Sequence, residues 1–331
     1  MQITYFQRKP YDFHYSIEKL FDTIRTYLPE EIRFSVVTCP YHSLGITTRI
    51  KNILFAYRNK GEINHITGDI HYLSLSLPVT NTINTFHDFT FLRTSNKLKY
   101  AFLKLFWVTI PVKRSSIVTV ISETTKRELI QLTGCAEEKI KVIPNIIPSH
   151  FVPVPKQFNS HKPIILHIGT TPNKNTERLF EAIKNIHCQL LIVGKLSKEH
   201  QDLLQKYDID YTNYFKISEE QLTSLYQQCD ILSFCSLNEG FGMPILEAQA
   251  TGRPVVTSNI SSMPEVAGEG ACYVNPFDVN DIRKGILSVI NDDTYRETLI
   301  TNGLKNTKRF QPKEVAAQYV AIYEEISNSI K

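Results

Sequence analysis

Short apolar runs rich in β-branched residues alternate with longer amphipathic stretches along almost the whole chain of 331 residues. The predicted strands are Ile3–Phe6, Phe34–Thr38, Ile83–Phe86, Ile117–Ile121, Ile140–Ile143, Ile164–Ile168, Leu190–Val193, Ile231–Phe234, Val255–Ser258 and Cys272–Val274. Segments of helical length and periodicity separate most of them. Strand–helix alternation of this kind predicts parallel sheets with helices on both faces, which is the doubly wound α/β fold class.

A proline-rich stretch interrupts this alternation near the middle of the chain. Residues 148–163 contain four prolines and show no periodicity, so we predict an extended linker there. The linker divides the chain into two Rossmann-like domains, residues 1–150 and residues 151–311. We expect residues 312–331 to form a helix that packs back on the first domain. Its predicted apolar face consists of Val315, Tyr319, Ile322, Ile326 and Ile330.

Composition narrows the classes of function. A net charge of +4 does not require a polyanionic partner, so we predict no binding of nucleic acid. The six cysteines form no CxxC pair, and we interpret them as reduced thiols. The N-terminal residues lack the apolar segment of a secretory signal, and no apolar run has the length of a membrane span. These features favour a cytoplasmic protein.

The most specific stretch carries the pattern Glu-Gly-Phe-Gly-x-Pro-x-x-Glu, from Glu239 to Glu247. It follows a predicted strand, so it lies at the carboxyl end of that strand, where ligands bind in such sheets. Gly240 and Gly242 let backbone amides approach a ligand closely, and Pro244 suits the first turn of the next helix. The carboxylates can accept hydrogen bonds from sugar or ribose hydroxyls, and the amides can bind phosphate. Glu247 alone is equally consistent with a solvated acid, but the complete pattern favours a ligand site.

With these residues the sequence resembles the retaining glycosyltransferases of the family 4 (group 1) type, which have the GT-B fold. The resemblance covers about residues 80 to 310 and is strongest from Ser218 to Pro276. It includes the segments 218–226, 257–268 and 273–276 besides the glutamate pattern. It implies two Rossmann-like domains that face a cleft, the first on the acceptor side and the second binding a nucleotide sugar.

The resemblance also implies roles for residues of the glutamate pattern. Glu247 would hold the ribose hydroxyls of the nucleotide. Glu239 would contact hydroxyls of the donor sugar near the reacting centre. The backbone amides of Phe241, Gly242 and Met243 would face the sugar and the diphosphate.

A second contact with the diphosphate is implied after the first strand of the second domain. Gly169 and Lys174 lie there on a loop that enters a helix, which is a suitable place for a cation to meet phosphate. Family members commonly have an arginine where this chain has Thr170. Lys195, after the next strand, would compensate, although a solvated loop lysine explains it equally well.

In the first domain, His87 and Asp88 match the family's His-Asp position, and His87 would hydrogen-bond the donor sugar. Many relatives have a glycine pair after the first strand, and this chain has none there. Arg8, Lys9 and Tyr11 are the candidates that would replace it as contacts with the acceptor.

The implied chemistry is transfer of a hexose from a nucleoside-diphosphate sugar with retention of configuration, by front-face attack without an enzyme nucleophile. Cations, amides and the helix dipole would stabilise the leaving diphosphate. The sequence shows no His/Asp cluster with metal-like spacing, so we predict no cofactor and no required divalent metal.

We expect the acceptor to be a glycan or a lipid-linked glycan of a surface polysaccharide. Residues 93–114 combine lysines and arginines with aromatic residues and contain no acid. They predict either a core helix with a basic edge or a segment that lies peripherally on a membrane. Two alternatives to glycosyl transfer stay open, namely a nucleotide-sugar epimerase of the same fold and a non-catalytic partner of a true transferase.

Overall fold

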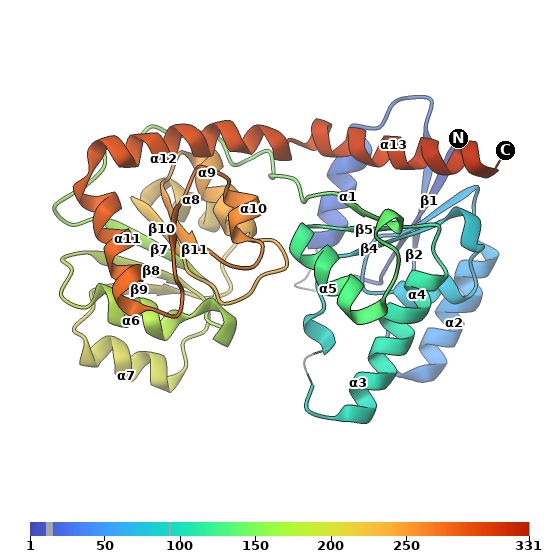
Figure 1. Cartoon of the computed structure of the whole chain (residues 1–331), viewed down its shortest axis with the longest axis horizontal. Coiled ribbons are helices and arrows are strands. Elements are labelled where there is room, and N and C mark those ends of the chain that lie inside the picture. The colour runs from blue at the N-terminus through green and yellow to red at the C-terminus, as the bar shows by residue number, and fades with distance from the viewer. Residues whose placement is uncertain (11–15, 93, 331) are drawn as a thin grey trace. The chain divides into compact units, whose positions relative to one another are not determined.

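The computed structural model describes residues 1–10, 16–92 and 94–330. The chain forms two compact units (Figure 1). Unit 1 consists of Met1–Ile146 together with Pro312–Lys331, and unit 2 consists of Ile147–Gln311. Tyr11 and Arg93 lie outside the described residues.

Unit 1 contains a six-stranded parallel sheet in the order β2-β1-β3-β4-β5-β6. The strands are β1 (Gln2–Gln7), β2 (Arg33–Thr38), β3 (Ile63–Ile66), β4 (Thr82–Phe86), β5 (Ile117–Val120) and β6 (Ile140–Val142). The helices are α1 (Ser16–Thr26), α2 (Gly45–Arg58), α3 (Lys97–Leu103), α4 (Ile110–Lys113), α5 (Glu123–Thr133) and α13 (Pro312–Ile330).

The C-terminal helix α13 packs on unit 1, as its periodicity predicts. Val315, Tyr319 and Ile322 are buried with residues of β1, β3, β4 and β5 in one apolar cluster. Ile330 is exposed, so the predicted apolar face ends one turn early. Burial of a polar group requires a hydrogen-bond partner, and the Tyr323 hydroxyl has one in His65 Nδ1, at 2.8 Å.

The basic stretch in unit 1 is one succession of helical turns that differ in burial. Helix α3 leads into a π-helical segment, Lys104–Thr109, and then into α4. Leu98 and Phe102 on α3 are exposed, whereas Trp107 and Val112 are buried. The stretch is therefore core packing in its second half and exposed apolar surface in its first half.

Unit 2 contains a second six-stranded parallel sheet, in the order β12-β11-β10-β7-β8-β9. The strands are β7 (Ile164–Ile168), β8 (Gln189–Val193), β9 (Tyr211–Tyr214), β10 (Ile231–Phe234), β11 (Val255–Ser258) and β12 (Cys272–Val274). The helices are α6 (Thr176–Ile183), α7 (Lys198–Lys206), α8 (Glu219–Gln228), α9 (Met243–Thr251), α10 (Met263–Ala267), α11 (Val279–Asn291) and α12 (Asp293–Asn306). The two parallel sheets confirm the predicted α/β fold class with two Rossmann-like domains.

The proline-rich stretch contains no strand or helix, and it is fastened to unit 2. The buried carboxylate of Asp230 accepts a hydrogen bond from the backbone N–H of Asn159 at 3.2 Å and forms an ion pair with Lys156. The buried guanidinium of Arg253 donates to the carbonyl oxygen of Val154 at 3.0 Å. Because these anchors are charged groups inside unit 2, the stretch is held against that unit rather than left free in solvent.

All six cysteines lie within the described residues and are free thiols, and five of them are buried. Burial raises the pKa of Cys39, Cys229 and Cys235 to about 12, so these thiols stay protonated at neutral pH. The prediction of reduced cysteines is confirmed.

Candidate functional site

The loop after β10 and the start of α9 form the centre of the site in unit 2. Gly242 precedes α9 with a φ of +114°, a region that a residue with a Cβ atom rarely adopts. Met243 begins the helix, and Pro244 occupies its first turn, as predicted. The Phe241 ring is buried against Phe310, with the ring centroids 5.9 Å apart. The loop therefore presents a glycine backbone at the open end of a nine-residue helix.

Lys174 and Glu239 form an ion pair in unit 2, with 2.7 Å between Lys174 Nζ and Glu239 Oε1. Both side chains are partly buried. The Lys174 ammonium also lies 4.6 Å from the ring centroid of Phe234, a cation–π arrangement. An ammonium group has three donors, so Lys174 can hold Glu239 and still donate to a phosphate oxygen.

Gly169 makes room for the Lys174 side chain. Its φ is +91°, and a Cβ atom there would lie 2.8 Å from Lys174 Cε and 2.9 Å from Lys174 Cγ. Any larger residue at this position would displace the lysine stem. Gly169 therefore positions Lys174 by leaving space.

Glu247 lies on α9 and accepts a hydrogen bond from the hydroxyl of Tyr226, at 2.7 Å. Burial raises the pKa of Glu247 to about 7, although the Tyr226 hydrogen bond and the charge of Lys174 both lower it. At neutral pH the carboxyl is thus close to half ionised, and a ligand that donates hydrogen bonds to it favours the ionised form.

Thr170 and Lys195 meet through the backbone. The Thr170 hydroxyl donates to the carbonyl oxygen of Lys195 at 2.8 Å, and the Lys195 residue is exposed. Gly194, with a φ of +151°, leaves space for Thr170, because a Cβ atom there would lie 2.7 Å from the threonine side chain. Thr170 therefore ties two loops together at the carboxyl ends of β7 and β8.

Several residues that support this site were not singled out from the sequence. The Asn173 amide donates to Glu239 Oε1 at 3.2 Å, and the Ser262 hydroxyl donates to the carbonyl oxygen of Phe241 at 2.6 Å. Ser261 donates to the carbonyl oxygen of Glu239 at 2.9 Å. The segment 257–268 was noted only as part of the family resemblance. Its serines hold the shape of the glutamate loop.

His87 belongs to unit 1, where it follows β4. Its Nε2–H donates to the carbonyl oxygen of Thr67 at 2.8 Å. Burial lowers the pKa of His87, so the ring is neutral at pH 7 and Nδ1 is left as an acceptor. Asp88 is exposed and accepts a hydrogen bond from the backbone N–H of Thr90 at 2.7 Å, which shapes the local turn.

A hollow of about 320 Å³ lies in unit 1 at the carboxyl ends of the strands. It is lined by basic, acidic and apolar side chains, among them Arg8, Lys9, Arg49, Asp69, Asp88 and Trp107. Arg8 forms ion pairs with Asp69 and with Glu18. The structure therefore gathers the predicted acceptor contacts Arg8 and Lys9 around a hollow at the ligand-binding edge of the sheet.

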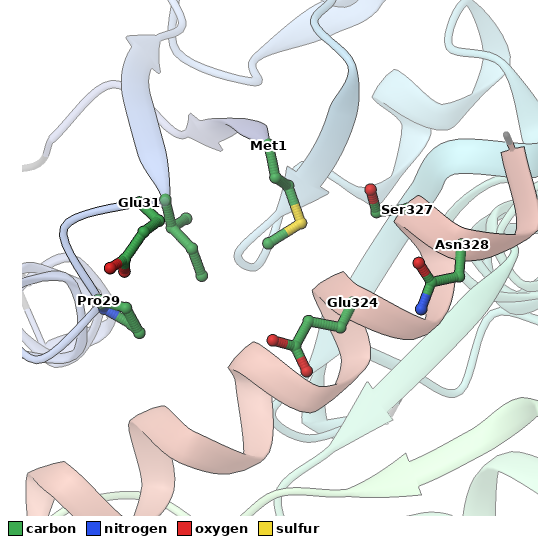
Figure 2. Close-up of a pocket in the computed structure, with 7 residues that line it drawn as sticks. Met1, Pro29, Glu31, Glu324, Ser327 and Asn328 are labelled. Carbon is green, nitrogen blue, oxygen red and sulfur yellow. The ribbon is translucent and has the colours of Figure 1, made fainter.

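A second hollow in unit 1 has the opposite character. It measures about 530 Å³ and is lined by Glu31 and Glu324 together with Met1, Pro29 and Ser327 (Figure 2). No lysine or arginine of the described residues lines it, and it lies at the amino ends of β1 and β2. This hollow lacks the features expected of a phosphate site.

Two features are absent from the described residues. No group of three or more His, Cys, Asp or Glu side chains is placed to hold a metal ion. Over the same residues, none of the helices combines the length and the apolar character needed to cross a membrane.

Two family models match this chain. Residues 151–306 match the model of the glycosyl transferases group 1, and residues 31–151 match the model of Glycosyltransferase Family 4. The first match contains the loops and the helix that carry Lys174, Glu239 and Glu247.

The chain is similar to curated mannosyltransferases. It is 27% identical over 313 residues to O-antigen chain mannosyltransferase B of Escherichia coli, covering 90% of this chain and 72% of the relative. It is 26% identical over 224 residues to the serotype-specific mannosyltransferase WbdA of the same species. That alignment covers 60% of this chain and only 27% of WbdA, so the chain spans a small part of that relative.

Solved structures share the fold at low sequence identity. The chain is similar to sucrose-phosphate synthase from Thermosynechococcus elongatus, with a TM-score of 0.77 and 17% identity over 99% of both chains. It is also similar to Anabaena HepE in complex with UDP and glucose, with a TM-score of 0.77 and 16% identity over 98% of this chain and all of the other. These likenesses concern the fold alone, and they agree with the GT-B fold that the sequence implied.

Proposed function

Because the chain belongs to the group 1 glycosyltransferases, as a hexosyltransferase, we propose that it transfers a sugar from a nucleoside-diphosphate donor bound in unit 2, with retention of configuration. The observation that carries the donor proposal is the pairing of Lys174 with Glu239 beside the open end of α9, which also bears Glu247. A cation, two carboxylates and unpaired helix amides match a ligand that has both phosphates and hydroxyls.

In this proposal, each group binds a different part of the donor. The Glu247 carboxylate accepts hydrogen bonds from the ribose hydroxyls, and Glu239 accepts them from the sugar. Lys174, together with the amides of Phe241, Gly242 and Met243, binds the diphosphate and stabilises its charge as the bond to the sugar breaks.

Transfer proceeds on one face of the sugar. The acceptor hydroxyl attacks the anomeric carbon from the side that the diphosphate leaves. The departing phosphate oxygen takes the hydroxyl proton, so no enzyme nucleophile is needed. We propose that this step requires no divalent metal, because Lys174 and the amides at the start of α9 would supply the positive charge that a metal ion provides in other enzymes.

We propose mannose as the transferred hexose and a polysaccharide as the product, on the strength of the relatives named O-antigen chain mannosyltransferase B and serotype-specific mannosyltransferase WbdA. Both of these relatives are named as transferases, which favours transfer over epimerisation. The family resemblance implies a hydrogen bond from the sugar to His87 of unit 1, and Nδ1 is the ring atom left to accept it.

The acceptor binds in unit 1 in this proposal. The hollow beside Arg8, Lys9 and Arg49 offers cations for the phosphates of a lipid-linked glycan. Exposed Leu98 and Phe102, next to the lysines of α3, support peripheral contact of residues 93–114 with a membrane.

A thermal-shift screen tests the donor site. Purified protein is melted with the mannose and glucose conjugates of GDP, UDP and ADP, with and without a chelator. A ligand that binds only the native state raises the melting temperature by mass action. We expect a shift with one nucleotide, insensitive to the chelator and lost in Glu247→Ala.

The matched control is Glu297→Ala, which removes an exposed glutamate from α12 of the same unit. It should retain the full shift. Folded wild-type protein that responds to no nucleotide would overturn the donor site, and a shift abolished by the chelator would overturn its metal independence.

A further inference from the structure

Helix α2 of unit 1 turns an apolar row toward solvent. Ile46, Ile50 and Leu54 lie four residues apart on one side of the helix, and Leu44 and Tyr57 extend the row at its two ends. These five side chains are between 49% and 69% exposed. An ordinary surface helix presents polar residues to water, so this row is unusual.

The opposite side of α2 packs into the unit through Asn52 and Ala56. Asn52 is fully buried, and its amide donates to the carbonyl oxygen of Tyr41 at 2.9 Å and to the hydroxyl of Tyr72 at 3.1 Å. Hydrogen bonds thus fix the orientation of the helix. The apolar row is a fixed feature of the folded unit and not a consequence of loose packing.

Positive charge surrounds the row. Residues 33–61 contain Arg33, Arg49, Lys51, Arg58 and Lys60 and no aspartate or glutamate. The Lys60 ammonium lies 4.2 Å from the ring centroid of Tyr57, and that of Lys51 lies 5.2 Å from the ring centroid of Tyr41. Tyrosine and lysine side chains with an apolar body and a polar tip suit a boundary between water and hydrocarbon.

We propose that this α2 face, defined by Leu44, Ile46, Ile50, Leu54 and Tyr57 with Lys51, Arg58 and Lys60, docks the protein on an anionic lipid surface. The apolar row enters the boundary between headgroups and acyl chains, and the cations meet the lipid phosphates. A second copy of the chain is a poor occupant, because pairing this face with itself would bring two sets of cations together without an acid.

The α2 face also relates to the acceptor hollow. Arg49 belongs to α2 and lines the hollow, and its guanidinium lies 4.5 Å from the ring centroid of Trp107. A lipid-linked acceptor could then reach the hollow from the membrane on which α2 rests. This inference deepens the proposed function, and it can be tested without any donor or acceptor, so the two can fail separately.

The experiment is cosedimentation of the full chain with sucrose-loaded vesicles. One set of vesicles is phosphatidylcholine alone, and the other contains equal parts of phosphatidylcholine and phosphatidylglycerol. We expect wild-type protein to bind the anionic vesicles and to stay in solution with the neutral ones. Ile50→Ser/Leu54→Ser should weaken binding by about tenfold or more, because two aliphatic groups no longer enter the lipid.

Charge reversal gives a second variant. Lys51→Glu/Arg58→Glu should weaken binding by at least about 25-fold, since each basic residue near an anionic surface contributes about fivefold. Lys198→Glu/Lys206→Glu makes the same change of charge on exposed α7 of unit 2 and should bind as wild type does. The substituted side chains are exposed, so all variants should keep the wild-type melting temperature.

Three results would overturn the proposal. The first is wild-type protein that binds neither kind of vesicle. The second is binding that survives both α2 variants and disappears with Leu98→Ser/Phe102→Ser, which would assign the contact to α3 alone. The third is a dimer in solution that the α2 variants dissociate, which would assign the face to a second copy.

Discussion

The raised pKa of Glu247 gives a quantitative prediction for donor binding. If the ribose hydroxyls donate to this carboxyl, only its ionised form is competent to bind. With a pKa of about 7, the ionised fraction is about 9% at pH 6 and about 91% at pH 8. The apparent affinity for the donor should therefore rise about tenfold between pH 6 and pH 8.

The assay is isothermal titration calorimetry with a nucleotide sugar, whose diphosphate has no proton that titrates in this range. Glu247→Gln keeps the shape of the side chain and cannot ionise. We expect its affinity to be independent of pH between 6 and 8, and weaker than that of wild type at pH 8 by about 2 kcal/mol, or about thirtyfold. This loss corresponds to replacing two charged hydrogen bonds with neutral ones.

Tyr226→Phe tests the cause of the pH dependence. The Tyr226 hydroxyl donates to Glu247 and lowers the pKa of that carboxyl, so its removal should raise the pKa and move the binding curve to higher pH. Two results would refute the reasoning. One is wild-type affinity that does not change with pH, and the other is the same tenfold rise in Glu247→Gln.

Three further substitutions follow from contacts in unit 2, and a fourth, in unit 1, serves as a control. Gly169→Ala would place a Cβ atom against the Lys174 stem and should reduce kcat/KM at least about tenfold. The control is Gly134→Ala, at a φ of +65° with open space around it. It should cost about 1 kcal/mol of unfolding free energy and leave transfer unchanged. Lys174→Met should lower kcat by about a hundredfold in steady-state assays, and an unchanged rate would exclude Lys174 from the charge on the leaving group. Arg253→Met would leave the Val154 carbonyl and other buried carbonyls without a hydrogen-bond donor. It should lower the urea midpoint of unfolding by an amount equivalent to about 3 kcal/mol. An unchanged midpoint would contradict the anchoring role.

All ten strands predicted from the sequence are present, because each contains a run of apolar or β-branched residues. The sheets bury most of these runs, although Phe34 and Val36 of the edge strand β2 are exposed. The two missed strands lack such a run. β3 is four residues long, and two of them, Asn64 and His65, are polar yet fully buried. Their burial depends on partners such as Tyr323, which is distant in the sequence. β9 lies at the edge of its sheet, where exposure removes the need for apolar residues.

The candidate site was predictable as a set of residues and not as a set of contacts. The glycine pattern and the proline of α9 locate the loop, since each has a local backbone reason. The ion pair of Lys174 with Glu239 joins residues 65 positions apart, and the hydrogen bond of Tyr226 to Glu247 spans 21 positions. Such pairs depend on how the strands are ordered in the sheet, which no local pattern encodes.

The outward apolar row of α2 was missed for a related reason. Periodicity shows that a helix has an apolar side, but it does not show which side faces the sheet. Here the buried side carries Ala56 and the hydrogen bonds of Asn52 with Tyr41 and Tyr72, so the row of larger apolar residues is left exposed.

We propose that this chain transfers a hexose with retention of configuration. The most direct measurement is proton NMR of the hexose that the wild-type enzyme releases to water from an α-linked nucleotide sugar, recorded before the free sugar mutarotates. The α anomer should form first, and Glu247→Ala should release neither anomer at a comparable rate. First appearance of the β anomer would contradict retention, and a donor that binds without any release would contradict the catalytic role of the site.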